Sequence, residues 1–123
     1  MKIKCIKIYN EHKQTYEEKS AWLTIGKEYI VLAIEIYQDK VSFLIASDSN
    51  EQPVLQNAVQ FEILTKKIPT NWQIAPGVIE LFTIGPKSWR ELGFWEDCYE
   101  HEPKALEIYK QEARIIMEEE NAL

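Results

Sequence analysis

Cysteine, histidine and glycine are scarce in this sequence, which argues against several classes of protein. Two cysteines, Cys5 and Cys98, stand near opposite ends of the 123 residues, whereas a disulfide-rich secreted domain carries several at close spacing. Structural zinc sites usually need paired Cys or His motifs, and no C-x-x-C occurs. With four glycines and no G-x-S-x-G, H-E-x-x-H or phosphate-binding glycine loop, no known catalytic motif is present. We therefore expect free thiols, no metal, no cofactor and no catalytic residue.

Long apolar stretches are also missing. Residues 1–7 alternate lysine with apolar residues, a pattern typical of neither a signal peptide nor a membrane span. The 46% hydrophobic and 28% charged fractions are ordinary for a globular chain, and the length fits one domain. The sequence therefore predicts a single soluble domain over 1–123, cytoplasmic and without membrane contact.

The body of this domain, residues 1–85, is predicted to be rich in strands. Segments with β-branched and aromatic residues alternate with turn residues such as Gly26 and the cluster 48–53. The predicted strands are residues 3–9, 29–37, 41–46, 59–64 and 78–84. Residues 29–46 are expected to form a hairpin, and the polar segment 10–20 a loop. Five antiparallel strands at short spacing predict a meander that closes into a small β-barrel or forms a curled sheet.

The C-terminal part, residues 86–120, is predicted to be helical. Ser88 is expected to cap a short helical turn that Gly93 ends, and Pro103 suits the first turn of a longer helix. One apolar stripe repeats at helical spacing in that helix: Leu106, Tyr109, Ala113, Ile116 and Met117. We expect the stripe to pack the helix on the sheet, which makes the fold class α+β.

Charge is distributed unevenly along the chain. The net charge is −6, and residues 96–123 alone contain nine acidic and three basic residues. Such a surface repels phosphate backbones, so we expect no DNA binding and a partner with a basic surface. Lysines gather only near the N-terminus and at Lys66 and Lys67, where they are expected to protect an edge strand.

The segment 89–101 concentrates aromatic and acidic side chains. Large aromatics provide contact area in protein interfaces, and carboxylates provide orientation. The residues predicted to contact a partner are Glu91, Trp95, Glu96, Asp97, Tyr99 and Glu100. The structural alternative is that Phe94 and Trp95 close the open end of a barrel, with the carboxylates merely solvated.

A chemical role for Cys98 is a second alternative. Cys98 and His101 are three residues apart and would share a helical face. With Asp97 or Asn71 they could form a nucleophilic site, and with Asp97, Glu100 or His12 a metal site. Both ideas lack the motifs that normally accompany such chemistry.

Two stretches resemble known proteins. The pattern Leu23-x-x-Gly26-x-x-Tyr29-x-Val31, with Phe43-Leu44-Ile45-x-x-Asp48, Pro53, Ala58, Phe61-Glu62-Ile63 and Trp72, resembles small SH3-like β-barrels of bacterial proteins. Pro86-x-x-Trp89 and Gly93-Phe94-Trp95-Glu96, with the helix after them, are similar to the tail of small bacterial immunity proteins, which block toxins of contact-dependent or polymorphic systems.

The resemblance implies a non-enzymatic immunity protein that binds a cognate toxin. The acidic C-terminal part favours a toxin with a basic surface, for which a nuclease is one example. Immunity proteins bind toxins through different surfaces, so no functional residue is carried over. The alternatives are a small barrel that binds a ligand or RNA, and a small enzyme that uses Cys98 and His101. The oligomeric state is left open.

Overall fold

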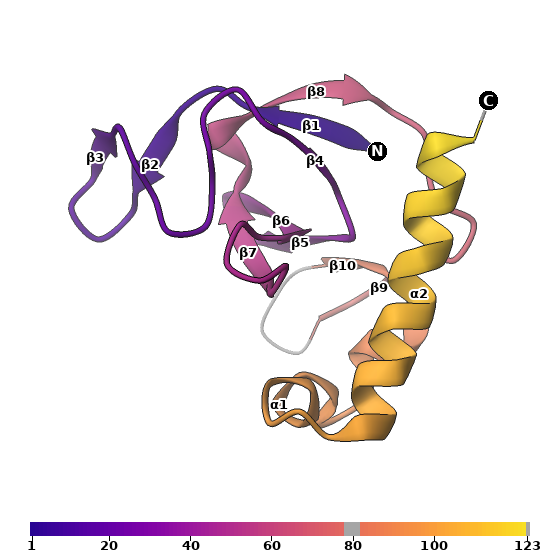
Figure 1. Ribbon diagram of the computed structural model, residues 1–123. Coiled ribbons are helices and arrows are strands. Elements are labelled where there is room, and N and C mark those ends of the chain that lie inside the picture. Colours follow the sequence, from indigo (N-terminus) through magenta and orange to yellow (C-terminus); the bar gives the residue numbers. More distant parts are fainter. Residues whose placement is uncertain (78–81, 123) are drawn as a thin grey trace.

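The computed structural model describes residues 1–77 and 82–122. Its strands are β1 (Lys2–Cys5), β2 (Ile8–Asn10), β3 (Thr15–Glu17), β4 (Glu28–Ile30), β5 (Ala33–Tyr37), β6 (Lys40–Ala46), β7 (Pro53–Asn57), β8 (Phe61–Thr65), β9 (Gln73–Ala75) and β10 (Phe82–Gly85). Its helices are the 3₁₀ turns η1 (Ala58–Gln60) and η2 (Lys87–Arg90) and the α-helices α1 (Phe94–Tyr99) and α2 (Pro103–Asn121). Antiparallel strands with a long C-terminal helix confirm the predicted α+β class (Figure 1).

The strands form three sheets. One has the order β4-β1-β8, a second has the order β7-β6-β5-β10-β9, and β2 pairs with β3 alone. The SH3-like barrel suggested by the sequence is absent from the described residues, and ten short strands stand where about five were expected.

The long apolar run 29–37, predicted as one strand, is two strands in different sheets. β4 pairs with β1, whereas β5 pairs with β6 and β10. Between them, Val31 N donates to Met1 O at 2.9 Å and Leu32 N donates to Leu44 O at 2.8 Å. The chain therefore changes sheets at two completely buried residues. The predicted 29–46 hairpin is confirmed in its β5–β6 part.

The N-terminal prediction differs in a similar way. The strand expected over 3–9 is interrupted at Ile6 and Lys7, whose amides both donate to Gln60 O, at 2.9 and 3.3 Å. The segment 10–20, expected to be a loop, contains β3, and Gln14 near its start has a φ of 54°. β2 and β3 thus form a hairpin that the polar sequence did not indicate.

Later strand boundaries also shift. β7 begins at Pro53, the last residue of the turn cluster 48–53, and was not predicted. β8 begins only after η1, where the Asn57 side chain accepts from Val59 N. Of the strand predicted over 78–84, residues 78–81 lie outside the described residues, and β10 covers the remainder.

Two hydrophobic cores lie on opposite faces of β6. Phe43 and Ile45 belong to the first core and Leu44 to the second, because successive side chains of a strand point to opposite faces. The first core also contains Ile3, Cys5, Ile8, Leu23, Tyr29, Val31 and Phe61. The second also contains Leu32, Trp89, Phe94, Cys98, Ala105, Ala113 and Ile116. The helices therefore cover one face of the five-stranded sheet, as expected for α2.

α2 begins as predicted at Pro103, where the Glu102 carboxylate accepts from Lys104 N and Ala105 N. Ser88, by contrast, does not cap η2; its hydroxyl donates to Glu112 Oε2 at 3.2 Å. Gly93, with a φ of 80°, stands between η2 and α1. None of the described helices is both long and apolar enough to cross a membrane.

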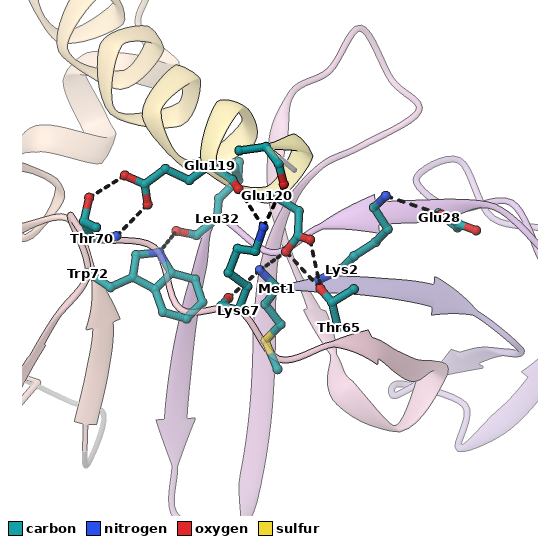
Figure 2. Close-up of polar contacts among 11 residues, drawn as sticks. Met1, Lys2, Glu28, Leu32, Thr65, Lys67, Thr70, Trp72, Glu119 and Glu120 are labelled. Atoms are coloured by element: carbon teal, nitrogen blue, oxygen red, sulfur yellow. Dashed lines mark hydrogen bonds and ion pairs between the residues drawn. The ribbon is translucent and has the colours of Figure 1, made fainter.

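The C-terminal end of α2 is fixed to the N-terminal strand (Figures 1 and 2). The buried Glu120 carboxylate pairs with the α-amino group of Met1 and accepts from Thr65 Oγ1 at 2.9 Å. Met1 N also donates to Lys67 O at 2.8 Å, and Lys67 Nζ donates to Glu119 O at 3.1 Å. Burial acts to raise the pKa of Glu120, but the ammonium group and Thr65 hold that pKa below its usual range.

We predict that Glu120→Gln lowers the free energy of unfolding by about 2 kcal/mol at neutral pH. The amide keeps the size of the side chain but leaves the Met1 ammonium without its counter-ion. Because the folded pKa is depressed, the carboxylate stabilises the fold above its unfolded-state pKa, and this stabilisation is lost as the pH falls through the folded value. Urea unfolding at neutral pH and at about pH 3 measures the effect.

The exposed neighbour Glu118 supplies the control. Glu118→Gln should change stability by less than about 0.5 kcal/mol at either pH. A loss for Glu120→Gln that is the same at both pH values would show that the ion pair is not its cause.

Candidate functional site

α1 separates buried apolar residues from exposed acidic ones. Phe94 and Cys98 are four residues apart and point into the second core, because residues at that spacing share a helix face. Glu96, Asp97 and Glu100 are exposed. The first-turn position of Glu96 and Asp97 also suits the positive end of the helix dipole.

Five aromatic rings pack together where η2, α1 and α2 meet. Trp89 stacks on Tyr109 with centroids 5.3 Å apart, and Trp95 meets Trp89 edge-on at 5.5 Å. Phe94 lies 5.1 Å from Trp95, and Tyr99 lies 6.0 Å from it. We call these five residues the aromatic cluster. It joins η2, α1 and α2, so α1 is held by packing on both neighbouring elements.

A polar contact holds the end of α1. The Tyr99 hydroxyl donates to Pro53 O, at the start of β7, at 3.0 Å, while almost half of the Tyr99 side chain stays exposed. α1 is thereby tied to the sheet as well as to α2.

The exposed acids of this region are free of internal partners. Glu91, Glu96, Asp97 and Glu100 make no ion pair or side-chain hydrogen bond within residues 1–77 and 82–122; we call these four the α1 acidic surface. Most other acids of the tail do have contacts: Glu102 caps α2, and the remainder with partners are Glu107, Glu112, Glu119 and Glu120. Part of the tail's negative charge is thus paired within the fold, and most of the unpaired carboxylates among the described residues lie on or beside α1, with Glu118 on α2 as the exception.

All six residues predicted to contact a partner lie on α1 or beside it. Five of them are exposed, and Trp95 is half-buried within the aromatic cluster.

The chain matches no family model, no curated protein and no solved structure. Its chemistry is therefore inferred from its own residues.

Cys98 and His101 are not joined into a site. Cys98 is buried and its thiol donates to Ala105 O at 3.5 Å, whereas His101 is exposed beyond the end of α1 with a φ of 62°. In the described part of the chain, no three potential metal ligands come together. Burial raises the pKa of the Cys98 thiol, and the charges of Asp97 and Glu102 raise that pKa further. The arrangement disfavours the thiolate that nucleophilic chemistry needs.

We predict that neither Cys98 nor Cys5 reacts with iodoacetamide in the folded protein near neutral pH. Both thiols are buried and both have a raised pKa, so the reactive thiolate is rare and poorly accessible. Mass spectrometry should find modification only after denaturant is added. Rapid labelling of Cys98 alone in the native protein would instead favour the enzyme alternative.

The sequence did not indicate either of two surface hollows. The first, of about 650 Å³, lies between the β2–β3 hairpin and the five-stranded sheet. Several of its polar groups are already paired: Glu11 with Asn57 and Lys40, and Glu17 with Asn10. These side chains around the hollow are therefore bonded to one another.

The second hollow, of about 900 Å³, runs between α2 and the segment 46–53 and reaches the end of α1. We call it the α2 groove. Its wall on α2 is visible in the sequence as the stripe that contains Leu106 and Met117. Its other wall comes from residues more than fifty positions earlier, which no local pattern could reveal.

Proposed function

We propose that this chain is a non-enzymatic immunity protein that neutralises a basic bacterial toxin by direct binding. The observation that carries the proposal is the α1 acidic surface: four exposed carboxylates without internal partners among the described residues, two within α1 and two beside it, around a helix fixed by aromatic packing. The resemblance of residues 86–96 to immunity-protein tails supports the same conclusion.

A fixed helix favours binding because less conformational freedom is lost when the complex forms. The aromatic cluster and the Tyr99–Pro53 hydrogen bond keep α1 in place before a partner arrives. Carboxylates pair strongly with arginine and lysine, and arginine accepts them in a two-point geometry.

A nuclease is the toxin class that suits this charge best. Nucleases carry cations on the surface that holds the phosphate backbone. An acidic helix can occupy that surface and exclude the nucleic acid. Complementary charge also accelerates association, which is useful when a toxin has to be captured before it acts.

Co-purification from the source cells tests the proposal. The affinity tag belongs at the C-terminus, because the Met1 amino group is paired with Glu120. The test variant carries Glu96→Lys, Asp97→Lys and Glu100→Lys. The control carries Glu18→Lys, Asp39→Lys and Glu62→Lys, three exposed acids from other elements that change the net charge equally.

The native chain and the control should retain a basic protein in a stoichiometric amount, and the test variant should lose it. Equal recovery with all three chains would show that binding uses another surface. Recovery of no basic protein with the native chain would remove the support for an immunity role.

A further inference from the structure

The α2 groove has an apolar lining that is only partly buried by the second core. Leu106, Tyr109 and Met117 lie on one face of α2, are only half-buried and line the groove. Ala46 and Pro53 line it from the sheet side. The apolar stripe of α2 therefore does more than pack the helix: Ala113 and Ile116 lie in the second core, and Tyr109 and Met117 pack against that core while also lining the hollow.

Two cations stand on the rim above this lining. Lys110 and Arg114 are one helical turn apart, both are exposed, and both line the groove. Within residues 1–77 and 82–122, neither makes an ion pair or a side-chain hydrogen bond. In the smaller hollow, by contrast, the carboxylates of Glu11 and Glu17 already accept hydrogen bonds from neighbouring side chains.

Tyr109 lines the same wall and carries a hydroxyl group that can donate a hydrogen bond. This hydroxyl makes no hydrogen bond among the described residues, although the ring is packed against Trp89. Burial raises the pKa of Tyr109 well above its usual value, so the phenol stays protonated and able to donate.

We propose that the α2 groove binds a small amphipathic carboxylate. The apolar body of the ligand lies against Leu106, Tyr109 and Met117, and its carboxylate lies between Lys110 and Arg114. This binding does not depend on the toxin.

The dimensions and charges of the groove favour a small ligand with one anionic group. Its volume falls in the range of roughly 300–1,000 Å³ that is usual for small-molecule sites. The α2 wall from Leu106 to Met117 is about 16 Å long at the rise of an α-helix. Glu51 and Glu118 also stand on the rim, and they would repel an acidic peptide that ran the length of the groove.

Calorimetric titration of the full chain with decanoate, below its micellar concentration, tests the proposal, with decanol as the uncharged comparison. Decanoate should bind at one site, and decanol about tenfold more weakly. Arg114→Gln or Lys110→Gln should weaken decanoate binding roughly threefold to fivefold each. Glu118→Gln should strengthen it about twofold, because a repulsive charge is removed.

Two further variants locate the site. Lys104→Gln removes the same charge from an exposed position of α2 outside the groove, and it should leave affinity within about twofold. Met117→Trp fills the groove and should abolish binding. The charge variants should keep the native fold.

Several results would overturn the proposal. Decanoate that does not bind, or that binds Arg114→Gln and Lys104→Gln equally well, contradicts the role of the rim cations. A native chain that sediments as a dimer, and that Met117→Trp converts to a monomer, assigns the groove to a second copy instead. None of these measurements involves the toxin, so their failure is distinct from failure of the immunity proposal.

Discussion

Replacement of Trp89 by alanine is expected to lower the free energy of unfolding by about 4 kcal/mol. Trp89 is only 4% exposed and lies in the second core. Its ring contacts both Tyr109 on α2 and Trp95 on α1. Its removal would leave a cavity where three elements meet, and large-to-small changes are most damaging at such sites. Urea unfolding followed by circular dichroism measures the loss.

Trp89→Phe is the matched comparison. The indole Nε1 of Trp89 is buried and has no hydrogen-bond partner in the described structure, so phenylalanine removes an unsatisfied polar group together with part of the ring. We expect a loss of less than about 1.5 kcal/mol for this variant. If the alanine and phenylalanine variants were equally stable, Trp89 would not be what holds α1 and α2 together.

Charge reversal at Glu96, Asp97 and Glu100 is expected to slow association with the proposed basic toxin at least about tenfold at low ionic strength. The three carboxylates are exposed and have no cation of their own in the described residues. Their field therefore acts on an approaching partner. Reversal replaces attraction by repulsion. The association rate constant should therefore fall, and the dissociation rate constant should change by a smaller factor.

Ionic strength separates this effect from damage to the fold. Charges are screened over about 8 Å at physiological salt and over shorter distances at higher salt. The native rate should therefore fall as salt is added, and the difference between native and reversed chains should narrow. Stopped-flow measurement across salt concentrations checks this. A native association rate that salt leaves unchanged would exclude electrostatic steering by α1.

The fold class could be predicted, but the division into strands could not. Pro103 and the helical stripe identified α2, and the turn near Asp39 identified the β5–β6 hairpin. The apolar run 29–37 gave no sign of a break at Val31 and Leu32, because both residues are buried, one in each core. β7 was missed because its first residue, Pro53, belongs to a turn pattern.

The acidic character of α1 could be predicted from composition, but the different roles of the acids could not. Residues 118–120 are three successive glutamates that suggest a solvated helix end. Only Glu120 is buried, since it continues the inward-facing series of Ala113 and Ile116 at helical spacing. Extending that series by one turn would have identified it. The α2 groove had no such signal, because its walls are distant in sequence.

Amide hydrogen exchange of the chain, alone and with the proposed basic toxin recovered by co-purification, would show directly whether α1 is the binding surface. If it is, the toxin should slow exchange in residues 94–101, while the β2–β3 hairpin exchanges as it does in the free chain. Protection confined to the hairpin or to the five-stranded sheet, with α1 unchanged, would contradict this role of α1.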